Sequence, residues 1–161
     1  MGAGSGDPLR RPPHVIAPDE VDAWLADSVN RAVTYHRTLC SAATDILEHG
    51  IHISRSRVGA YGQGFYTASD VSQRPGDVDL AVAVRLRHPL VGHADDIDIE
   101  IDALVRRLAG TRGRLTPTVA AQVRQVLLAE GYDGLVVRDA EGEGIDYVIA
   151  LESSSVKVVR P

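Results

Sequence analysis

Apolar residues recur at intervals of three and four positions in several stretches of the chain, which is the spacing of one face of a helix. Residues 95–108 follow this pattern most regularly. Thr116 followed by Pro117 is a typical helix start, and Gly50 and Gly131 each stand where a helical pattern stops. These signals predict helices over 18–30, 41–48, 95–108 and 117–130.

Shorter apolar runs lie between these helical stretches. The run at 77–86 alternates polar and apolar residues and then fills with valine, which is typical of a strand with one buried face. The last apolar runs follow one another with no helical pattern between them, which favours an antiparallel-rich α+β domain over a doubly wound sheet. Strands are predicted over 32–36, 64–68, 77–86, 134–137, 147–151 and 156–159. A loop over 51–64 leads into the second of them.

The chain divides into three parts of unequal size. Residues 1–17 are rich in proline and glycine and lack apolar periodicity, so we expect a disordered tail. Residues 18–30 predict an amphipathic helix that carries the only tryptophan, Trp24, as a clamp onto the domain surface. Residues 31–161 have the length of one folded domain.

Charge, cysteine content and the length of apolar runs exclude several kinds of partner and site. The 161 residues carry a formal net charge of −5, which gives no overall attraction to nucleic acid or anionic lipid. The single cysteine, Cys40, excludes an intrachain disulfide and a cysteine-rich zinc site. No apolar run is long enough to span a bilayer, and no apolar stretch follows the Arg10–Arg11 pair as a secretion signal requires. We therefore expect no membrane partner and a protein that is cytoplasmic, or exported by a route independent of a signal peptide.

The segment Gly59–Tyr66 is the most distinctive candidate for ligand binding. It contains three glycines, the only phenylalanine and two tyrosines within eight residues. Glycine lets the backbone approach a ligand closely, and aromatic rings offer flat stacking surfaces, so the segment suits a planar heterocycle. The alternative is a glycine-rich hairpin whose aromatic side chains fill the core.

The order of several short motifs along the chain resembles the ADP-ribosyltransferase superfamily. The motifs are Tyr-His-x-Thr at 35–38, a helix ending at Gly50, Gly-x-Gly-Phe-Tyr at 62–66, Glu-Gly-Tyr-Asp-Gly at 130–134 and Asp-Tyr-Val-Ile at 146–149. The chain is most similar to the branch of diphtheria toxin and the poly-ADP-ribose polymerases, whose triad is His, Tyr and Glu. The resemblance spans about 34–159 and implies two small antiparallel-rich sheets that form a split β core with flanking helices.

The resemblance also implies roles for individual residues. His36, Tyr66 and Asp146 would form a catalytic His-Tyr-Asp set, with His36 on a ribose of NAD and Tyr66 stacked on nicotinamide. The backbone of Arg37 would pair with the nicotinamide carboxamide, where the family usually has glycine, and Tyr61 is the candidate for the second stacking tyrosine. The residues expected to bind NAD are His36, Arg37, Thr38, Tyr61, Gly64, Phe65 and Tyr66.

Asp146 is preferred over neighbouring acids on strand geometry. It immediately precedes the strand 147–151, where the family has its glutamate, and is one methylene shorter. Glu141 and Glu143 lie among glycines in a loop that nothing in the local sequence holds rigid, whereas a catalytic carboxylate needs a fixed position.

The function implied by the resemblance is mono-ADP-ribosyl transfer with NAD as co-substrate and no metal ion, as in a bacterial toxin, effector or modification enzyme. Two alternatives remain: an NAD glycohydrolase, with water as acceptor, and a catalytically inactive module that binds NAD or ADP-ribose. The acceptor of the ADP-ribosyl group could be a protein, a nucleic acid or a small molecule, and the sequence does not decide between them. For a toxin, a cognate immunity or antitoxin protein is a further candidate partner.

Overall fold

The fold is α+β and is built on one mixed sheet. The computed structural model describes residues 12–55, 59–71, 77–110 and 113–161. In this part of the chain, eight strands lie in the order β1-β8-β4-β2-β3-β7-β6-β5. The strands are β1 (Val15–Ile16), β2 (Thr34–Leu39), β3 (Phe65–Ala68), β4 (Asp77–Val84), β5 (Pro89–His93), β6 (Gly134–Arg138), β7 (Tyr147–Ala150) and β8 (Val156–Val159).

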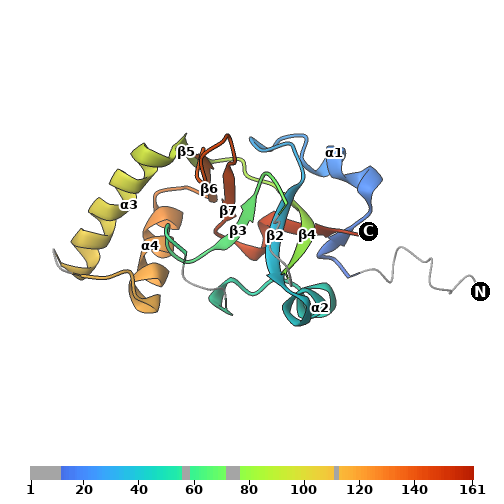
Figure 1. The fold of residues 1–161 in the computed structure, drawn as a ribbon, viewed down its shortest axis with the longest axis horizontal. Coiled ribbons are helices and arrows are strands. Elements are labelled where there is room, and N and C mark those ends of the chain that lie inside the picture. Colours follow the sequence, from blue (N-terminus) through green and yellow to red (C-terminus); the bar gives the residue numbers. More distant parts are fainter. Residues whose placement is uncertain (1–11, 56–58, 72–76, 111–112) are drawn as a thin grey trace, which may run out of the picture.

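The described helices pack against different parts of the sheet. Helices α3 and α4 cover the end formed by β5, β6 and β7, while α2 lies below β2 and β4 and α1 lies on the side of the C-terminus (Figure 1). Thr116 caps α4 through its hydroxyl, and Gly50 ends α2 with a φ of 84°, as the sequence predicts. The helices are α1 (Val21–Trp24), α2 (Cys40–His49), α3 (Ala94–Ala109) and α4 (Pro117–Ala129). None of these described helices is long and apolar enough to cross a membrane.

Most strand pairs are antiparallel, in agreement with the prediction from the sequence. Only the two outermost pairs, β1 with β8 and β5 with β6, are parallel. The described strands form one continuous sheet rather than the two expected, but its middle is weakly joined. β2 and β3 share a single register pair, Tyr35 with Ala68, whereas β2 pairs with β4 from Thr34 to Leu39.

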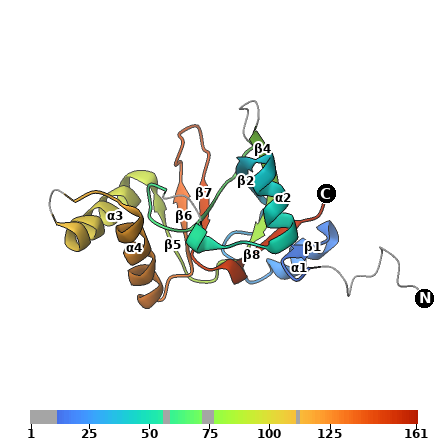
Figure 2. The same ribbon diagram turned by 90° about the horizontal axis from the view of Figure 1, so that it is seen from below.

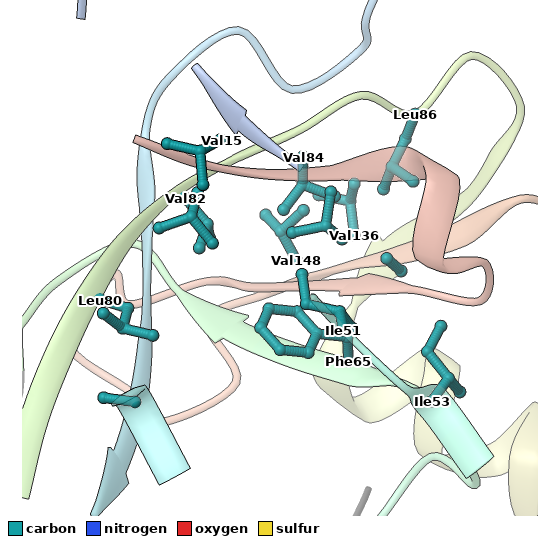
Figure 3. Close-up of a cluster of buried hydrophobic side chains, with 14 residues drawn as sticks. Val15, Ile51, Ile53, Phe65, Leu80, Val82, Val84, Leu86, Val136 and Val148 are labelled. Atoms are coloured by element: carbon teal, nitrogen blue, oxygen red, sulfur yellow. The ribbon is translucent and has the colours of Figure 1, made fainter. Parts of the chain in front are cut away.

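Two hydrophobic cores hold the two halves of the fold. The first lies against α2 and includes residues from β3, β4, β7 and β8, with Phe65 only 2% exposed (Figure 3). The second lies between β5, β6 and β7 on one side and α3 and α4 on the other. It is built from Ile97, Ile101, Val123, Leu135, Val137 and Ile149, among others.

The segment predicted as a helix over 18–30 is helical only at its start. A 3₁₀ turn at Pro18–Glu20 leads into α1, which ends at Trp24. The Trp24 ring lies beside the guanidinium of Arg85 and the amine of Lys157, which agrees with its expected role as a clamp.

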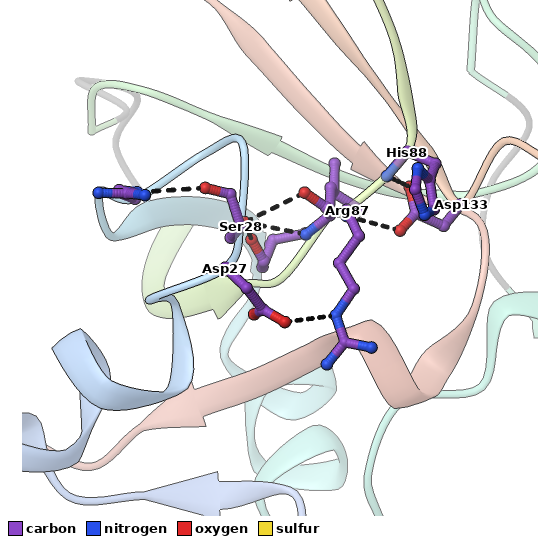
Figure 4. A network of polar contacts seen from close by, with 8 residues as sticks. Asp27, Ser28, Arg87, His88 and Asp133 are labelled. Atoms are coloured by element: carbon purple, nitrogen blue, oxygen red, sulfur yellow. Dashed lines mark hydrogen bonds and ion pairs between the residues drawn. The ribbon is translucent and has the colours of Figure 1, made fainter.

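Directly after α1 the side chain of Leu25 is buried, and hydrogen bonds hold the residues that follow it. The buried Ser28 hydroxyl accepts from the amide of Leu86 at 2.9 Å and lies 3.3 Å from the carbonyl of Val84 (Figure 4). Asp27 makes an ion pair with Arg87 in the same network. Val29 is 50% exposed, so the predicted apolar stripe ends before it.

The predicted tail is ordered near its end. Residues 1–11 lie outside the described part of the chain, but Val15 and Ile16 are buried and pair in parallel with Val158 and Val159. The carbonyl of His14 accepts from the amide of Val158 at 2.7 Å. The boundary predicted at residue 17 is therefore too late, because a strand of two residues among prolines gives no periodic signal.

Candidate functional site

A cleft of about 670 Å³ opens where β2 and β3 diverge. Beyond the single pair of Tyr35 with Ala68, the two strands make no further register pairs, so side chains of both strands face the opening. The lining also includes residues of α2, the segment Gly50–His52 that follows it, and Gly59 and Ala60. Figure 2 shows the β6–β7 connection projecting to the same edge as the corner between β2 and α2. A cleft of this size is within the range of small-molecule sites.

His36 lies at the centre of the divergence. Its Nδ1 is 2.7 Å from the carbonyl oxygen of Tyr66, and its ring stacks on Phe65 with 4.1 Å between centroids. A carbonyl only accepts, so Nδ1 carries the proton and donates. Burial lowers the pKa of His36, against the opposing effect of this hydrogen bond. The ring is therefore neutral at pH 7, and Nε2 is an acceptor.

Tyr66 is fixed by the turn that precedes β3. Its hydroxyl accepts from the amide of Tyr61 at 2.9 Å and donates to the carbonyl of Gly62 at 2.7 Å. The ring lies so close to Gly59 that a Cβ at that position would overlap its outer atoms. Burial raises the pKa of Tyr66, so the hydroxyl keeps its proton at any physiological pH. The turn and the ring thus hold each other in place.

Tyr61 does not reach the cleft. It is 6% exposed and packs in the second core against α3 and α4. Burial, followed by the neighbouring carboxylate of Asp98, raises its pKa. The expectation that Tyr61 could be the second stacking tyrosine is therefore wrong, and for this residue the core-filling alternative holds.

Tyr147 is the second tyrosine at this side of the cleft, and sequence reasoning missed it. It lines the cleft and pairs with Ala68, while its neighbour on the same face, Ile149, pairs with Tyr66. Alternation along a strand therefore puts Tyr147 on the face of Tyr66. The sequence contained this signal, because Tyr147 and Ile149 are two residues apart.

The other expected NAD-binding residues also line the cleft. Arg37 and Thr38 lie there on β2, and Gly64 and Phe65 lie there at the start of β3. A side chain at Gly64 would press on Ile149 and on the carbonyl of Ala150, so the backbone approaches β7 closely here. The Nε of Arg37 is buried and has no hydrogen-bond partner among the described residues.

Asp146 is not among the described residues that line the cleft. Its Oδ1 accepts from the amide of Asp139 at 2.9 Å, and its Oδ2 lies 3.6 Å from Arg138. Its own amide donates to the hydroxyl of Ser69, which ties β7 to the end of β3. The acid of this turn that does line the cleft is Glu141.

The turn that carries Glu141 is held by hydrogen bonds, contrary to the expectation from its glycines. The carboxylate of Asp139 accepts from the amide of Gly144 at 2.8 Å, and its carbonyl accepts from the amide of Gly142 at 3.2 Å. The amide of Ile145 donates to Gly142 at 3.1 Å. Glu141 is therefore carried by a turn that hydrogen bonds hold in place.

Metal-binding geometry is not found in the residues that the structure describes: no three His, Cys, Asp or Glu side chains are grouped to hold an ion. Cys40, at the start of α2, is exposed and carries a free thiol.

Comparisons with models of known protein families, with curated proteins and with solved structures gave no match to this chain.

Proposed function

We propose that the protein is an NAD-dependent mono-ADP-ribosyltransferase and that the cleft between β2 and β3 binds NAD. The observation that carries the proposal is the hydrogen bond from the ring of His36 to the backbone carbonyl of Tyr66, in a cleft whose lining also includes Glu141. The three residues are a His, a Tyr and an acid. These are the residue types of the triad in the family that the sequence resembles.

Two features of the sheet, beyond its α+β class, support this proposal. The sheet is joined across its middle by one register pair, and each half has its own core. A sheet that opens at this point is compatible with the split β core of the ADP-ribosyltransferases. The opening puts the cleft between the halves, where two strands supply residues to one ligand.

The chemistry requires cleavage of the bond between nicotinamide and C1′ of the ribose. The bond's electron pair leaves with neutral nicotinamide, positive charge develops on the ribose, and the acceptor forms the new bond to C1′ and releases a proton. Nε2 of the neutral His36 accepts a hydrogen bond from a ribose hydroxyl. The rings of Tyr66 and Tyr147 offer flat surfaces to the nicotinamide.

Glu141 is our candidate for the carboxylate that stabilises the developing charge. An ionised side chain near C1′ stabilises the transition state more than the ground state, which is the requirement for catalysis. The turn around Glu141 is held by Asp139 and Asp146, so the carboxylate is carried by a rigid segment. Asp146 then acts as a positioning residue.

The test is incubation of the purified chain with NAD labelled in its adenylate phosphate, with and without a cell lysate. Label on a lysate component supports transfer, free labelled ADP-ribose supports the glycohydrolase, and intact NAD that still binds supports the inactive module.

A variant series tests the site itself. Glu141→Gln should lower NAD turnover by about 10²- to 10³-fold, the loss typical of removing one preorganised transition-state contact, with NAD binding retained. Glu143→Gln is the matched control, because Glu143 is exposed on the same turn and is not among the described lining residues. Equal turnover by Glu141→Gln and the unchanged protein would exclude Glu141 as the catalytic acid.

A further inference from the structure

Arg37 has an unusual combination of properties for a strand residue. It lines the cleft and is partly buried, and its Nε is enclosed without a hydrogen-bond partner among the described residues. Buried polar groups in folded proteins are almost always hydrogen-bonded, so the guanidinium has unused donor capacity beside the cavity, which an acceptor on a ligand satisfies when the side chain turns toward it.

The charges of the cleft point to an anionic ligand group at Arg37. Among the described lining residues Arg37 is the only lysine or arginine, while Asp45, Asp70, Asp79 and Glu141 are acids. A dinucleotide carries two phosphates, which the acids repel. Its diphosphate therefore has one cationic partner available in the described lining.

The strand geometry fixes where Arg37 presents its side chain. Arg37 pairs with Asp79 of β4 in a continuous antiparallel ladder, so its backbone is part of a rigid element. Because side chains alternate along a strand, Arg37 lies on the same face of β2 as Tyr35 and on the opposite face from His36. Tyr35 pairs with Ala68, which in turn pairs with Tyr147. A ligand in the opening thus meets His36 from one face of β2 and Arg37 from the other.

We propose that Arg37 binds the diphosphate of the dinucleotide and so sets the preference of the cleft for phosphorylated over phosphate-free ligands. The planar guanidinium can donate two neighbouring N–H groups to two oxygens of one phosphate, a geometry that lysine cannot reproduce. This inference rests on the proposed function for the identity of the ligand. The family that the sequence resembles usually has glycine at this position.

The experiment is calorimetric titration of the full chain with ADP-ribose, inorganic pyrophosphate and adenosine, without divalent metal. Arg37→Gln should weaken binding of ADP-ribose and pyrophosphate by about 10- to 100-fold, the loss typical of a charge-assisted hydrogen-bond pair, and leave adenosine binding unchanged. Arg37→Lys should recover only part of the loss. Arg106→Gln is the matched control, because it removes the same charge from an exposed position on α3. Thermal unfolding of each variant checks that the fold is intact.

The outcomes separate this inference from the proposed function. Unchanged ADP-ribose and pyrophosphate binding by a folded Arg37→Gln, with NAD still turned over by the unchanged protein, overturns the inference alone. Arg37-dependent binding of ADP-ribose and pyrophosphate by a protein that leaves NAD intact supports the inference and rejects catalysis. A protein that binds none of these phosphorylated ligands overturns both.

Discussion

The backbone amide of Asp139 donates a 2.9 Å hydrogen bond to Oδ1 of Asp146, and this bond closes the base of the turn between β6 and β7. Asp139 adopts a φ of 58°, in the left-handed region that aspartate tolerates better than most residues. The two aspartates at the ends of the turn are thus engaged with its backbone. Glu141, between them, is the acid of the turn that lines the cleft.

Asp146→Asn and Asp146→Ala should therefore differ. Asparagine retains an oxygen that accepts from the amide of Asp139 and loses only a half-exposed pairing with Arg138, so its stability should change by less than about 0.5 kcal/mol. Alanine leaves that amide without its acceptor and should lower the free energy of unfolding by about 1–2 kcal/mol. Urea denaturation measures both values.

Turnover of NAD by the same two variants discriminates a positioning from a catalytic role for Asp146. A positioning role predicts near-normal turnover by Asp146→Asn and reduced turnover by Asp146→Ala, since the turn then holds Glu141 less well. Turnover by Asp146→Asn as low as that of Glu141→Gln would return the catalytic role to Asp146.

The case of Asp146 shows what the local sequence could not reveal. Alternation along a strand puts neighbouring residues such as Asp146 and Tyr147 on opposite faces, but it does not say which face meets the cleft, and here Tyr147 lines it. The glycines of the turn suggested mobility. Its order comes from side-chain bonds that Asp139 and Asp146 make to backbone amides, and such bonds depend on the final conformation of both ends.

Tyr66→Phe tests the link between the glycine-rich turn and the cleft. The variant keeps the ring but leaves the amide of Tyr61 and the carbonyl of Gly62 without the hydroxyl that satisfies both. We expect the free energy of unfolding to fall by about 1–3 kcal/mol, the cost of unsatisfied buried groups. The measurement is chemical denaturation. Tyr132→Phe is the control, because no hydrogen bond of its hydroxyl is found among the described residues. An unchanged stability of Tyr66→Phe would mean that the turn does not depend on this hydroxyl.

The elements with strong periodicity were predicted well, and those with weak local signals were not. The helix expected over 95–108 is α3, Ala94–Ala109, because its apolar face is long and regular. Strand β5 was missed, since Pro89 and Gly92 break its apolar run and its parallel pairing with β6 is a tertiary contact. Tyr61 was misplaced for a related reason: an aromatic residue near a cleft and one in the core look alike in sequence.

Removal of residues 1–17 should destabilise the protein, because it deletes β1. Val15 and Ile16 are buried and pair with β8. Val15 packs in the first core, and Ile16 packs with Val21, Leu25 and Ala83. Full burial of one such side chain is worth about 1.5–3 kcal/mol, so we expect a loss of about 2–5 kcal/mol. A chain that begins at Pro12 retains every described contact and is the control. Equal thermal midpoints for the two truncated chains would show that β1 contributes nothing to stability.

His36 should make both stability and ligand binding dependent on pH. Its pKa in the folded protein lies below the usual value near 6.5, because burial disfavours the charged ring. As pH falls below about 7, the unfolded chain takes up a proton on His36 before the folded chain does, so unfolding is favoured. The stability contributed by the neutral ring is thus fully present above pH 6.5 and is lost as pH falls through the folded pKa.

His36→Gln isolates this effect, since glutamine can donate to the carbonyl of Tyr66 and does not titrate near neutral pH. The difference in unfolding free energy between the unchanged protein and the variant should shrink between about pH 7 and pH 5. Binding of NAD by the unchanged protein should weaken over the same range, because protonation turns Nε2 from an acceptor into a donor. Denaturation and calorimetry at matched pH values measure the two effects. A difference in stability that is constant across this range would show that His36 has an ordinary pKa in the folded protein.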